Sequence, residues 1–270
     1  MSVIKKLESN IVNNIAAGEI IEGPSSVVKE LIENSIDAGS KKIEIYIENS
    51  GIKNILIKDD GLGMSKNDLA MAFQRHTTSK ISSKDDLFNI KTLGFRGEAL
   101  PSIASVSFLS AISKNNTDIH QIEIVGGKKN FLKKGALNSG TLIKVENLFF
   151  NLPARKKFLK SQTKEFNKIT SVVKSYALSY PDIGFNFTHN GREIYDLEPT
   201  TLENRICKIF GKKFKESLIP IEYEKDDCRI RGFTGNIDLL RKRKTNQFIF
   251  LNNRLIKDKA LDKAILTPFL

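Results

Sequence analysis

The clearest hydrophobic pattern lies between residues 24 and 39, where apolar positions recur at helical spacing. Pro24 and Ser25 predict the start of a helix with a hydroxyl group at its N-cap, because proline is favoured in the first turn and serine can cap free backbone N–H groups. Gly39 predicts the end of this helix. Its apolar residues fall on one broad face: Val27, Val28, Leu31, Ile32 and Ile36.

The pattern then changes to strict alternation. Residues 43–47 alternate isoleucine with polar residues, which is typical of a strand with one buried face. Residues 49–51 (Asn-Ser-Gly) predict a turn, and residues 55–57 predict a return strand that ends at Asp59. Strands joined by so short a turn pair antiparallel, so this region is not the βαβ crossover of a Rossmann fold.

The remaining pattern divides the chain in two. Further strands are predicted near residues 105–113, 119–125, 129–134 and 140–147, followed by a helix over 162–179. Asn190-Gly191 predicts a hairpin turn between two short strands. After about residue 200 the pattern restarts with a helix, strands near 217–223, 228–235 and 247–252, and a helix from 258. We therefore expect one domain over residues 1–200 and a second over residues 201–270.

Charge is distributed unevenly between these parts. Residues 1–100 hold 13 Lys/Arg against 14 Asp/Glu, and residues 101–270 hold 30 against 17. A basic surface attracts polyanions such as nucleic acid, although a lysine-rich solvated surface gives the same count. The two cysteines, Cys207 and Cys228, form no zinc-binding pattern and fit a reducing compartment. No apolar run approaches membrane-spanning length, so we expect a cytoplasmic protein without a membrane partner.

The predicted first helix carries a candidate catalytic pair. Glu30 and Asn34 are four residues apart and share one face, away from the apolar stripe. A carboxylate can activate a water molecule, and an amide oxygen can complete the shell of Mg²⁺. The same spacing separates Glu33 from Asp37, and either pair could also belong to an ordinary polar face. Spacing alone does not choose between them.

A second candidate site follows the hairpin. Residues 59–63 read Asp-Asp-Gly-Leu-Gly. The carboxylate of Asp59 could accept a hydrogen bond from an exocyclic amine such as that of adenine, while the glycines let the backbone approach a flat ring. The alternatives are a tight turn and a calcium loop, but the further acidic ligands of an EF-hand loop are missing.

A third candidate is the irregular segment 75–97, which is rich in Thr, Ser, Lys and Gly and is expected to be a lid. It ends in Gly94-Phe95-Arg96-Gly97, a glycine-rich turn before a predicted helix. Backbone N–H groups at such a turn suit a triphosphate, and Arg96 could add charge, although a plain helix start has the same composition. Neither GxxxxGK[ST] nor GxGxxG occurs. For His76 we favour a packing or lid role over that of a catalytic base.

In order along the chain, these segments resemble the GHKL ATPase superfamily, which groups type II topoisomerases, a heat-shock chaperone, sensor histidine kinases and MutL. Within it the sequence resembles the MutL family of DNA mismatch repair proteins. The segments that carry the resemblance are NNIAAGEII (13–21), SSVVKELIENSIDAG (25–39), DDGLGM (59–64), RHTTSKI (75–81), LGFRGEALPSIASV (93–106), GTLIKVENLFFNLPARKKFL (140–159) and HNGREI (189–194). The resemblance implies an α+β fold: a GHKL (Bergerat) α/β sandwich with a mixed, mostly antiparallel sheet, followed by part of a second, βαβ-type domain.

The resemblance also implies roles for individual residues. Glu30 is expected to be the general base, Asn34 the Mg²⁺ ligand, and Asp59 the reader of adenine, with Gly63 beneath the base. Thr141 is expected to support the adenine side through water. The residues expected near the phosphates of ATP are Thr78, Ser79, Lys80, Gly94, Phe95, Arg96 and Gly97.

A basic stretch with a single acid, Glu165, follows residue 154. It contains Arg155, Lys156, Lys157, Lys160, Lys164, Lys168 and Lys174. With the resemblance, Arg155, Lys156, Lys157 and Lys160 are expected to contact the DNA backbone, as is Arg254 in the second domain, without sequence preference. The further partners implied are a MutS-type mismatch recognition protein, a downstream nuclease and helicase, and a second copy in an ATP-dependent homodimer. The expected place is the bacterial nucleoid, or the nucleus if the source is eukaryotic.

The sequence departs from the family pattern in two ways. Relatives read Glu-Arg-Pro where this chain has Glu22-Gly23-Pro24. The family segment whose lysine reaches the ATP phosphates is not in the sequence, and neither are the carboxy-terminal dimerisation domain and a metal-endonuclease motif. One alternative is therefore a module that binds ATP or DNA and hydrolyses negligibly. Another GHKL enzyme, such as a topoisomerase subunit or a histidine kinase, is a second alternative, disfavoured by LGFRGEAL and by the lack of a phospho-acceptor histidine box.

Overall fold

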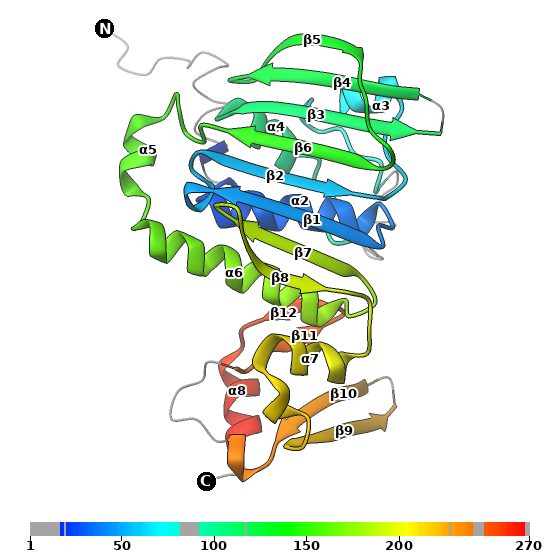
Figure 1. The fold of residues 1–270 in the computed structure, drawn as a ribbon, viewed down its shortest axis with the longest axis vertical. Coiled ribbons are helices and arrows are strands. Elements are labelled where there is room, and N and C mark those ends of the chain that lie inside the picture. The colour runs from blue at the N-terminus through cyan, green and yellow to red at the C-terminus, as the bar shows by residue number, and fades with distance from the viewer. Residues whose placement is uncertain are drawn as a thin grey trace, which may run out of the picture. The chain divides into compact units, whose positions relative to one another are not determined.

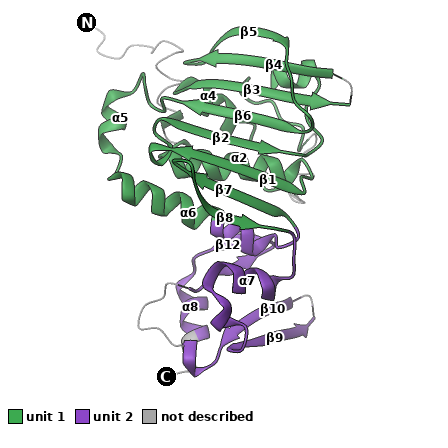
Figure 2. Cartoon of the chain, in the orientation of Figure 1, with its two compact units in different colours: residues 1–173, 183–198 green, residues 174–182, 199–270 purple. Residues whose placement is uncertain are grey.

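The computed structural model describes residues 17–18, 20–81, 92–116, 118–226, 228–239 and 246–267. The chain forms two compact units (Figure 2). The first comprises residues 1–173 and 183–198, and the second comprises 174–182 and 199–270. The predicted domain limits, 1–200 and 201–270, stay a prediction. The two units differ from them in that residues 174–182 group with the second unit. No helix in the described part of the chain is long and apolar enough to cross a membrane.

The first unit is built on one eight-stranded sheet with the order β5-β4-β3-β6-β2-β1-β7-β8 (Figure 1). The strands are β1 (Lys42–Glu48), β2 (Asn54–Asp59), β3 (Phe108–Asn115), β4 (Asp118–Val125), β5 (Lys128–Lys134), β6 (Thr141–Glu146), β7 (Gly184–His189) and β8 (Arg192–Leu197). The β1–β7 pair is parallel, and the other neighbours are antiparallel. The expected mixed, mostly antiparallel sheet is confirmed.

Helices cover one face of this sheet. They are α2 (Pro24–Asp37), α3 (Lys66–Met71), α4 (Ala99–Ser105) and α6 (Gln162–Ser179), whose end belongs to the second unit. The short helix α5 (Pro153–Phe158) precedes α6 and has no buried residue. In Figure 1, α2 and α4 lie behind the sheet. Ile43, Ile45 and Ile47 of β1 are buried, whereas the residues between them are partly exposed. This alternation, as predicted from the sequence, produces the sandwich.

Helix α2 has one end that the sequence predicted and one that it did not. Its N-cap is Gly23, which has no side chain to accept a hydrogen bond, so the predicted hydroxyl N-cap is wrong. Pro24 takes the first helical position, where its missing N–H costs nothing, so the cap is Gly23, two residues before the predicted Ser25. At the other end the prediction is confirmed. Gly39 has φ 73°, and its N–H donates to the Ile36 carbonyl at 2.9 Å.

The other predicted elements are present, with shifted limits. Strand β3 begins at Phe108 rather than near residue 105, because α4 continues to Ser105. Asn190 and Gly191 both have positive φ between β7 and β8, as the hairpin prediction requires. The predicted helix over 162–179 is α6. Residues 82–91, within the predicted lid, lie outside the described residues.

The second unit contains α7 (Leu202–Phe210), β9 (Leu218–Lys225), β10 (Cys228–Gly235), β11 (Ile249–Leu251), β12 (Arg254–Ile256) and α8 (Lys259–Leu266). Strands β9 and β10 form one antiparallel pair, and β11 and β12 form another. The parallel pair of a βαβ unit does not occur among the described strands of this unit. That part of the sequence prediction is therefore not confirmed.

Arg205 on α7 is a buried cation that joins α7 to the end of α6. Its side chain is fully buried. The guanidinium donates to the carbonyl oxygens of Ala177 and Pro181, both at 2.9 Å. These carbonyls lie at and beyond the carboxyl end of α6, where the helix itself supplies no donors. Arg205 on α7 thus supplies the hydrogen-bond donors at the carboxyl end of α6.

We expect Arg205→Met to lower the free energy of unfolding of this unit by about 3 kcal/mol, because two buried carbonyl oxygens lose their donor. Urea unfolding followed by far-ultraviolet circular dichroism would measure the loss. Arg229→Met is the control, since Arg229 is half exposed and pairs with Glu224 at 3.2 Å. Its loss should stay below about 1 kcal/mol. Equal losses for both variants would contradict this role of Arg205.

Candidate nucleotide site

The polar face of α2 presents two carboxylates in different surroundings. The side chain of Glu30 is 25% exposed, and that of Glu33 is 9% exposed. Lys29 lies between them, 3.3 Å from Glu30 and 3.5 Å from Glu33. A general base must be reached by the water molecule that it deprotonates. The difference in exposure therefore favours Glu30 as a general base, a choice that helical spacing alone left open.

Asn34 and Asp37 lie one turn beyond Glu30 and Glu33 on α2, and both accept a hydrogen bond from the same lysine. The ammonium group of Lys80 donates to Asn34 Oδ1 at 2.9 Å and to Asp37 Oδ2 at 2.6 Å. Gly94 lies against this cluster: a Cβ placed on it would be 3.1 Å from Lys80 Nζ and 3.9 Å from Asn34 Oδ1. Three predicted site residues thus meet at one point. Amide oxygens such as Asn34 Oδ1 are among the oxygen ligands that Mg²⁺ accepts.

Asp59 lies at the end of β2, where three segments converge on its carboxylate. Ser35 Oγ donates to Oδ2 at 2.9 Å, and the N–H groups of Gly61 and Thr141 donate to Oδ1 at 3.0 and 3.2 Å. Burial raises the pKa of Asp59, while these hydrogen bonds act in the opposite direction. The carboxylate is held in one orientation at an energetic cost, so a further N–H donor would stabilise its charged form.

Ser35 connects the two ends of the site. It follows Asn34 directly on α2, and its hydroxyl donates to Asp59, 24 residues away. One helix therefore places Asn34 at the Lys80 cluster and Ser35 at the buried carboxylate. Ser35 was not predicted as a site residue, because a hydroxyl within a helical pattern gives no signal of this contact.

The glycines beside Asp59 allow backbone segments to approach closely. Gly63 has φ 67°, and a Cβ on it would be 1.8 Å from the Lys114 carbonyl oxygen. Gly140 has φ 68°, and a Cβ on it would be 2.0 Å from the Asp59 carbonyl oxygen. Both positions exclude any other residue for backbone reasons alone. The sequence analysis identified Gly63 for a different reason and missed Gly140, although it stands directly before Thr141.

Thr141 is buried at the start of β6. Its hydroxyl lies 2.8 Å from that of Ser113, which also accepts a hydrogen bond from the Met64 N–H at 2.7 Å. Thr141 therefore contacts Asp59 through its backbone and Ser113 through its side chain. Ser113 is a further residue that the sequence analysis missed.

Residues 75–81 and 92–97 form two arms that meet. Gly97 has φ 64°, and a Cβ on it would be 2.2 Å from the Thr77 carbonyl oxygen. His76 Nδ1 lies 2.8 Å from Glu98 Oε1, which agrees with a lid role for this histidine. On the first arm Thr78 and Ser79 are exposed, and Thr78 Oγ1 accepts from the Lys80 N–H at 3.2 Å.

On the second arm Phe95 and Arg96 contact each other. The guanidinium carbon of Arg96 lies 5.4 Å from the centre of the Phe95 ring. Arg96 is exposed, and Phe95 is partly exposed. The structure therefore gathers Lys80 and Gly94 at Asn34, and it leaves Thr78, Ser79 and Arg96 open to solvent on the same two arms.

The predicted DNA-contact residues differ in their surroundings. The Arg155 guanidinium donates to the carbonyls of Gly18 and Ile21, so it already has a structural role. Lys156 and Lys157 on α5 are exposed. In the second unit, Arg254 begins β12 and is exposed.

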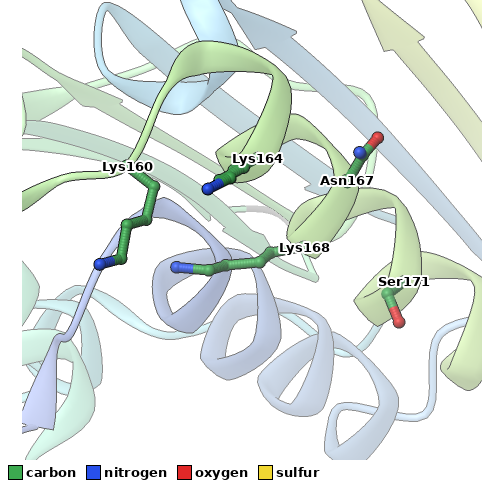
Figure 3. Close-up of a pocket in the computed structure, with 5 residues that line it drawn as sticks. All are labelled: Lys160, Lys164, Asn167, Lys168 and Ser171. Carbon is green, nitrogen blue, oxygen red and sulfur yellow. The ribbon is translucent and has the colours of Figure 1, made fainter.

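Lys160 borders a shallow cavity of about 440 Å³ on α6. Figure 3 shows that the ammonium groups of Lys160, Lys164 and Lys168 gather on one side of this helix. Buried Glu165 accepts from Lys168 Nζ at 2.9 Å and from the Lys160 N–H at 3.1 Å. One buried carboxylate thus balances part of this basic surface.

The chain is similar to known proteins in sequence and in fold. Residues 21–139 match the family described as histidine kinase-, DNA gyrase B- and HSP90-like ATPase. Residues 206–269 match the family described as DNA mismatch repair protein, C-terminal domain. The structure of the Aquifex aeolicus MutL ATPase domain complexed with ADP is 30% identical, with a TM-score of 0.70 over 92% of this chain and 88% of that chain. The GHKL ATPase fold expected from the sequence is confirmed.

Relatives of known family extend over nearly the whole chain. The DNA mismatch repair protein MutL of Clostridium acetobutylicum is 46% identical over 97% of this chain and 43% of its own length. That of Parabacteroides distasonis is 42% identical over 99% of this chain and 44% of its own length. The chain thus spans less than half the length of these relatives. On fold, motif order and identity, it belongs to the MutL family of DNA mismatch repair proteins.

Proposed function

We propose that this chain binds ATP with Mg²⁺ and hydrolyses the nucleotide slowly, as the ATPase part of a DNA mismatch repair protein. The observation that carries the proposal is the pair of neighbouring residues on α2, Asn34 and Ser35. Asn34 accepts a hydrogen bond from the Lys80 ammonium group, and Ser35 donates to the buried carboxylate of Asp59. These two features suit the phosphate end and the purine end of one nucleotide.

At the purine end, Asp59 accepts the exocyclic amine of adenine. The ring lies over Gly63, and Thr141 supports it through water. A buried carboxylate held by Gly61, Ser35 and Thr141 loses no orientational freedom when the purine binds. Because it accepts and does not donate, it prefers an amino-purine to a 6-oxo-purine.

At the phosphate end, Glu30 takes a proton from the attacking water. Asn34 would hold Mg²⁺, and the ion would supply positive charge to the phosphate oxygens. No group of three or more His, Cys, Asp or Glu side chains suited to a metal occurs within the described ranges. The residues proposed to face the phosphates are Thr78, Ser79, Lys80, Gly94, Phe95, Arg96 and Gly97.

Nucleotide binding completes the ordering of the two arms, which Asp37 already holds to α2, and promotes pairing of two copies, and hydrolysis reverses both changes. Ordering a segment through γ-phosphate contacts is a known type of switch. The paired form associates with DNA and connects a MutS-type recognition protein to a downstream nuclease and helicase. Such work belongs at the bacterial nucleoid in the cytoplasm.

The direct test is a crystal of this chain with Mg²⁺ and a non-hydrolysable ATP analogue, together with the steady-state turnover of ATP. We expect the purine at Asp59 and the phosphates at Asn34. Binding without measurable turnover would favour the alternative of a binding module. A nucleotide bound elsewhere would contradict the proposal as a whole.

We expect reversal of three exposed charges, Lys156→Glu, Lys157→Glu and Lys160→Glu together, to weaken binding to duplex DNA of any sequence. Each lost phosphate contact lowers the slope of log K against log salt by about 0.9, so the triple variant should lose about 2.7. Fluorescence anisotropy over a salt series measures both quantities. The matched control reverses Lys128, Lys129 and Lys134 on β5, which are also exposed. An equal effect of both triple variants would indicate general charge attraction rather than a local contact surface.

A further inference from the structure

Asp37, in the last turn of α2, is bound to parts of the chain that are far from it in sequence. Its Oδ1 accepts from the Leu93 N–H at 2.8 Å. Its Oδ2 accepts from the Gly94 N–H at 3.1 Å and from Lys80 Nζ at 2.6 Å. Lys80 belongs to the first arm, and Leu93 and Gly94 belong to the second. One carboxylate therefore fastens both arms to the helix that carries Asn34.

The chemistry of the carboxylate suits this task. An ionised carboxylate only accepts hydrogen bonds, and its two oxygens offer about four acceptor positions, so it can bind two backbone N–H groups and an ammonium group together. The Asp37 side chain is 7% exposed and that of Lys80 is 19% exposed, which limits competition from water. Charge-assisted bonds in such surroundings are stronger than those between neutral groups.

We propose that Asp37 is a positioning residue for the nucleotide. Its carboxylate sets the location of Lys80 and of the Leu93–Gly94 backbone relative to Asn34, so that both arms are in place when the phosphates arrive. This inference rests on the proposed function, because it assigns the phosphate end of the nucleotide to this cluster. Asp37 acts through the groups that it holds, and it is not itself placed against the reacting atoms.

The arrangement around Lys80 explains why a second anchor is needed. The ammonium group is shared between Asn34 Oδ1 and Asp37 Oδ2. A ligand that takes Asn34 Oδ1 removes one of these two partners. Asp37 then retains Lys80 beside the site, where its positive charge can face the phosphates. If Asp37 were absent, a ligand that took Asn34 Oδ1 would remove Lys80 from the only remaining partner of this pair.

Asp37→Asn tests the proposal, because it keeps the size of the side chain but replaces one acceptor oxygen with a donor. In the nucleotide-free protein we expect the amides of Leu93 and Gly94 to lose at least about tenfold of their protection from hydrogen exchange. We expect the KM for ATP to rise by about tenfold or more, while kcat changes by less than about threefold. Asp118→Asn, at an exposed position that begins β4, is the matched control and should change neither quantity.

The outcomes separate this proposal from the proposed function. If Asp37→Asn lost amide protection but the unmodified chain did not bind ATP, Asp37 would still hold the two arms, and the proposed nucleotide site would be wrong. Unchanged protection with unchanged KM would overturn the positioning role of Asp37, and so would a fall in kcat at constant KM. If Asp37→Asn does not fold, Asp37→Glu serves instead, since it keeps the charge but displaces the carboxylate. Its KM should rise by at least about threefold, and an unchanged KM would overturn the proposal.

Discussion

Asp59→Asn is expected to weaken ATP binding by about 100-fold, because an amide N–H₂ group would face the exocyclic amine of adenine in place of a carboxylate oxygen. The carboxylate is buried and oriented by Ser35, Gly61 and Thr141, so it has little freedom to turn away or to admit water. Isothermal titration with a non-hydrolysable ATP analogue measures the loss. Because burial raises the pKa of Asp59, the variant should remain folded and at least as stable as the original chain near neutral pH.

Asp60→Asn is the matched control for this experiment. The neighbouring carboxylate of Asp60 accepts from the N–H groups of Lys41 and Lys42 at 2.8 and 2.9 Å, so it supports the start of β1 instead of the purine end of the site. This variant should lose stability while its nucleotide affinity changes by less than about threefold. If Asp59→Asn bound the analogue as tightly as the original chain, the purine end would have to lie elsewhere.

Local periodicity was enough to predict the elements that carry the site. The apolar stripe of α2 and the alternation in β1 each reflect one buried face, and burial on one side of an element is what a sequence pattern records. The cap of α2 was missed because a proline and a serine side by side both favour a helix start, and only the geometry shows that Gly23 is the cap residue.

The site itself was predictable only as a set of alternatives. Helical spacing treats Glu30 with Asn34 and Glu33 with Asp37 alike, since both pairs are one turn apart. The difference between them is tertiary. Glu33 is turned towards the protein interior, and Asp37 is bound to the two arms. The family resemblance implied roles for Glu30 and Asn34, and it implied no role for Asp37.

Contacts between distant segments were beyond the reach of any local pattern. The Thr141 N–H meets Asp59 because β2 and β6 are neighbours, with Lys58 opposite Leu142. Likewise Gly63 must be glycine because the Lys114 carbonyl lies against it. Both facts depend on the order of strands in the sheet, and a single sequence does not specify that order.

Glu30→Gln is expected to lower the turnover of ATP by about 10²–10⁴-fold, because glutamine cannot accept the proton of the attacking water. Glutamine has nearly the same shape as glutamate, so affinity for Mg²⁺ with ATP should change by less than about threefold. Single-turnover hydrolysis measured beside equilibrium binding separates the two effects. A variant that bound ATP weakly but hydrolysed what it bound at the original rate would show that Glu30 holds the nucleotide and does not activate water.

Glu33→Gln provides the comparison that spacing could not make. Glu33 lies three residues after Glu30 on the same helix, and both carboxylates pair with Lys29. Each substitution therefore removes one negative charge beside the same lysine. Its side chain is 9% exposed against 25% for Glu30, which leaves it less access to a water molecule. We expect its turnover to stay within about threefold of the original and its stability to fall, since a buried charged partner is lost. If Glu33→Gln abolished hydrolysis and Glu30→Gln did not, the general base would be the buried carboxylate, and the water would have to reach it from within the nucleotide site.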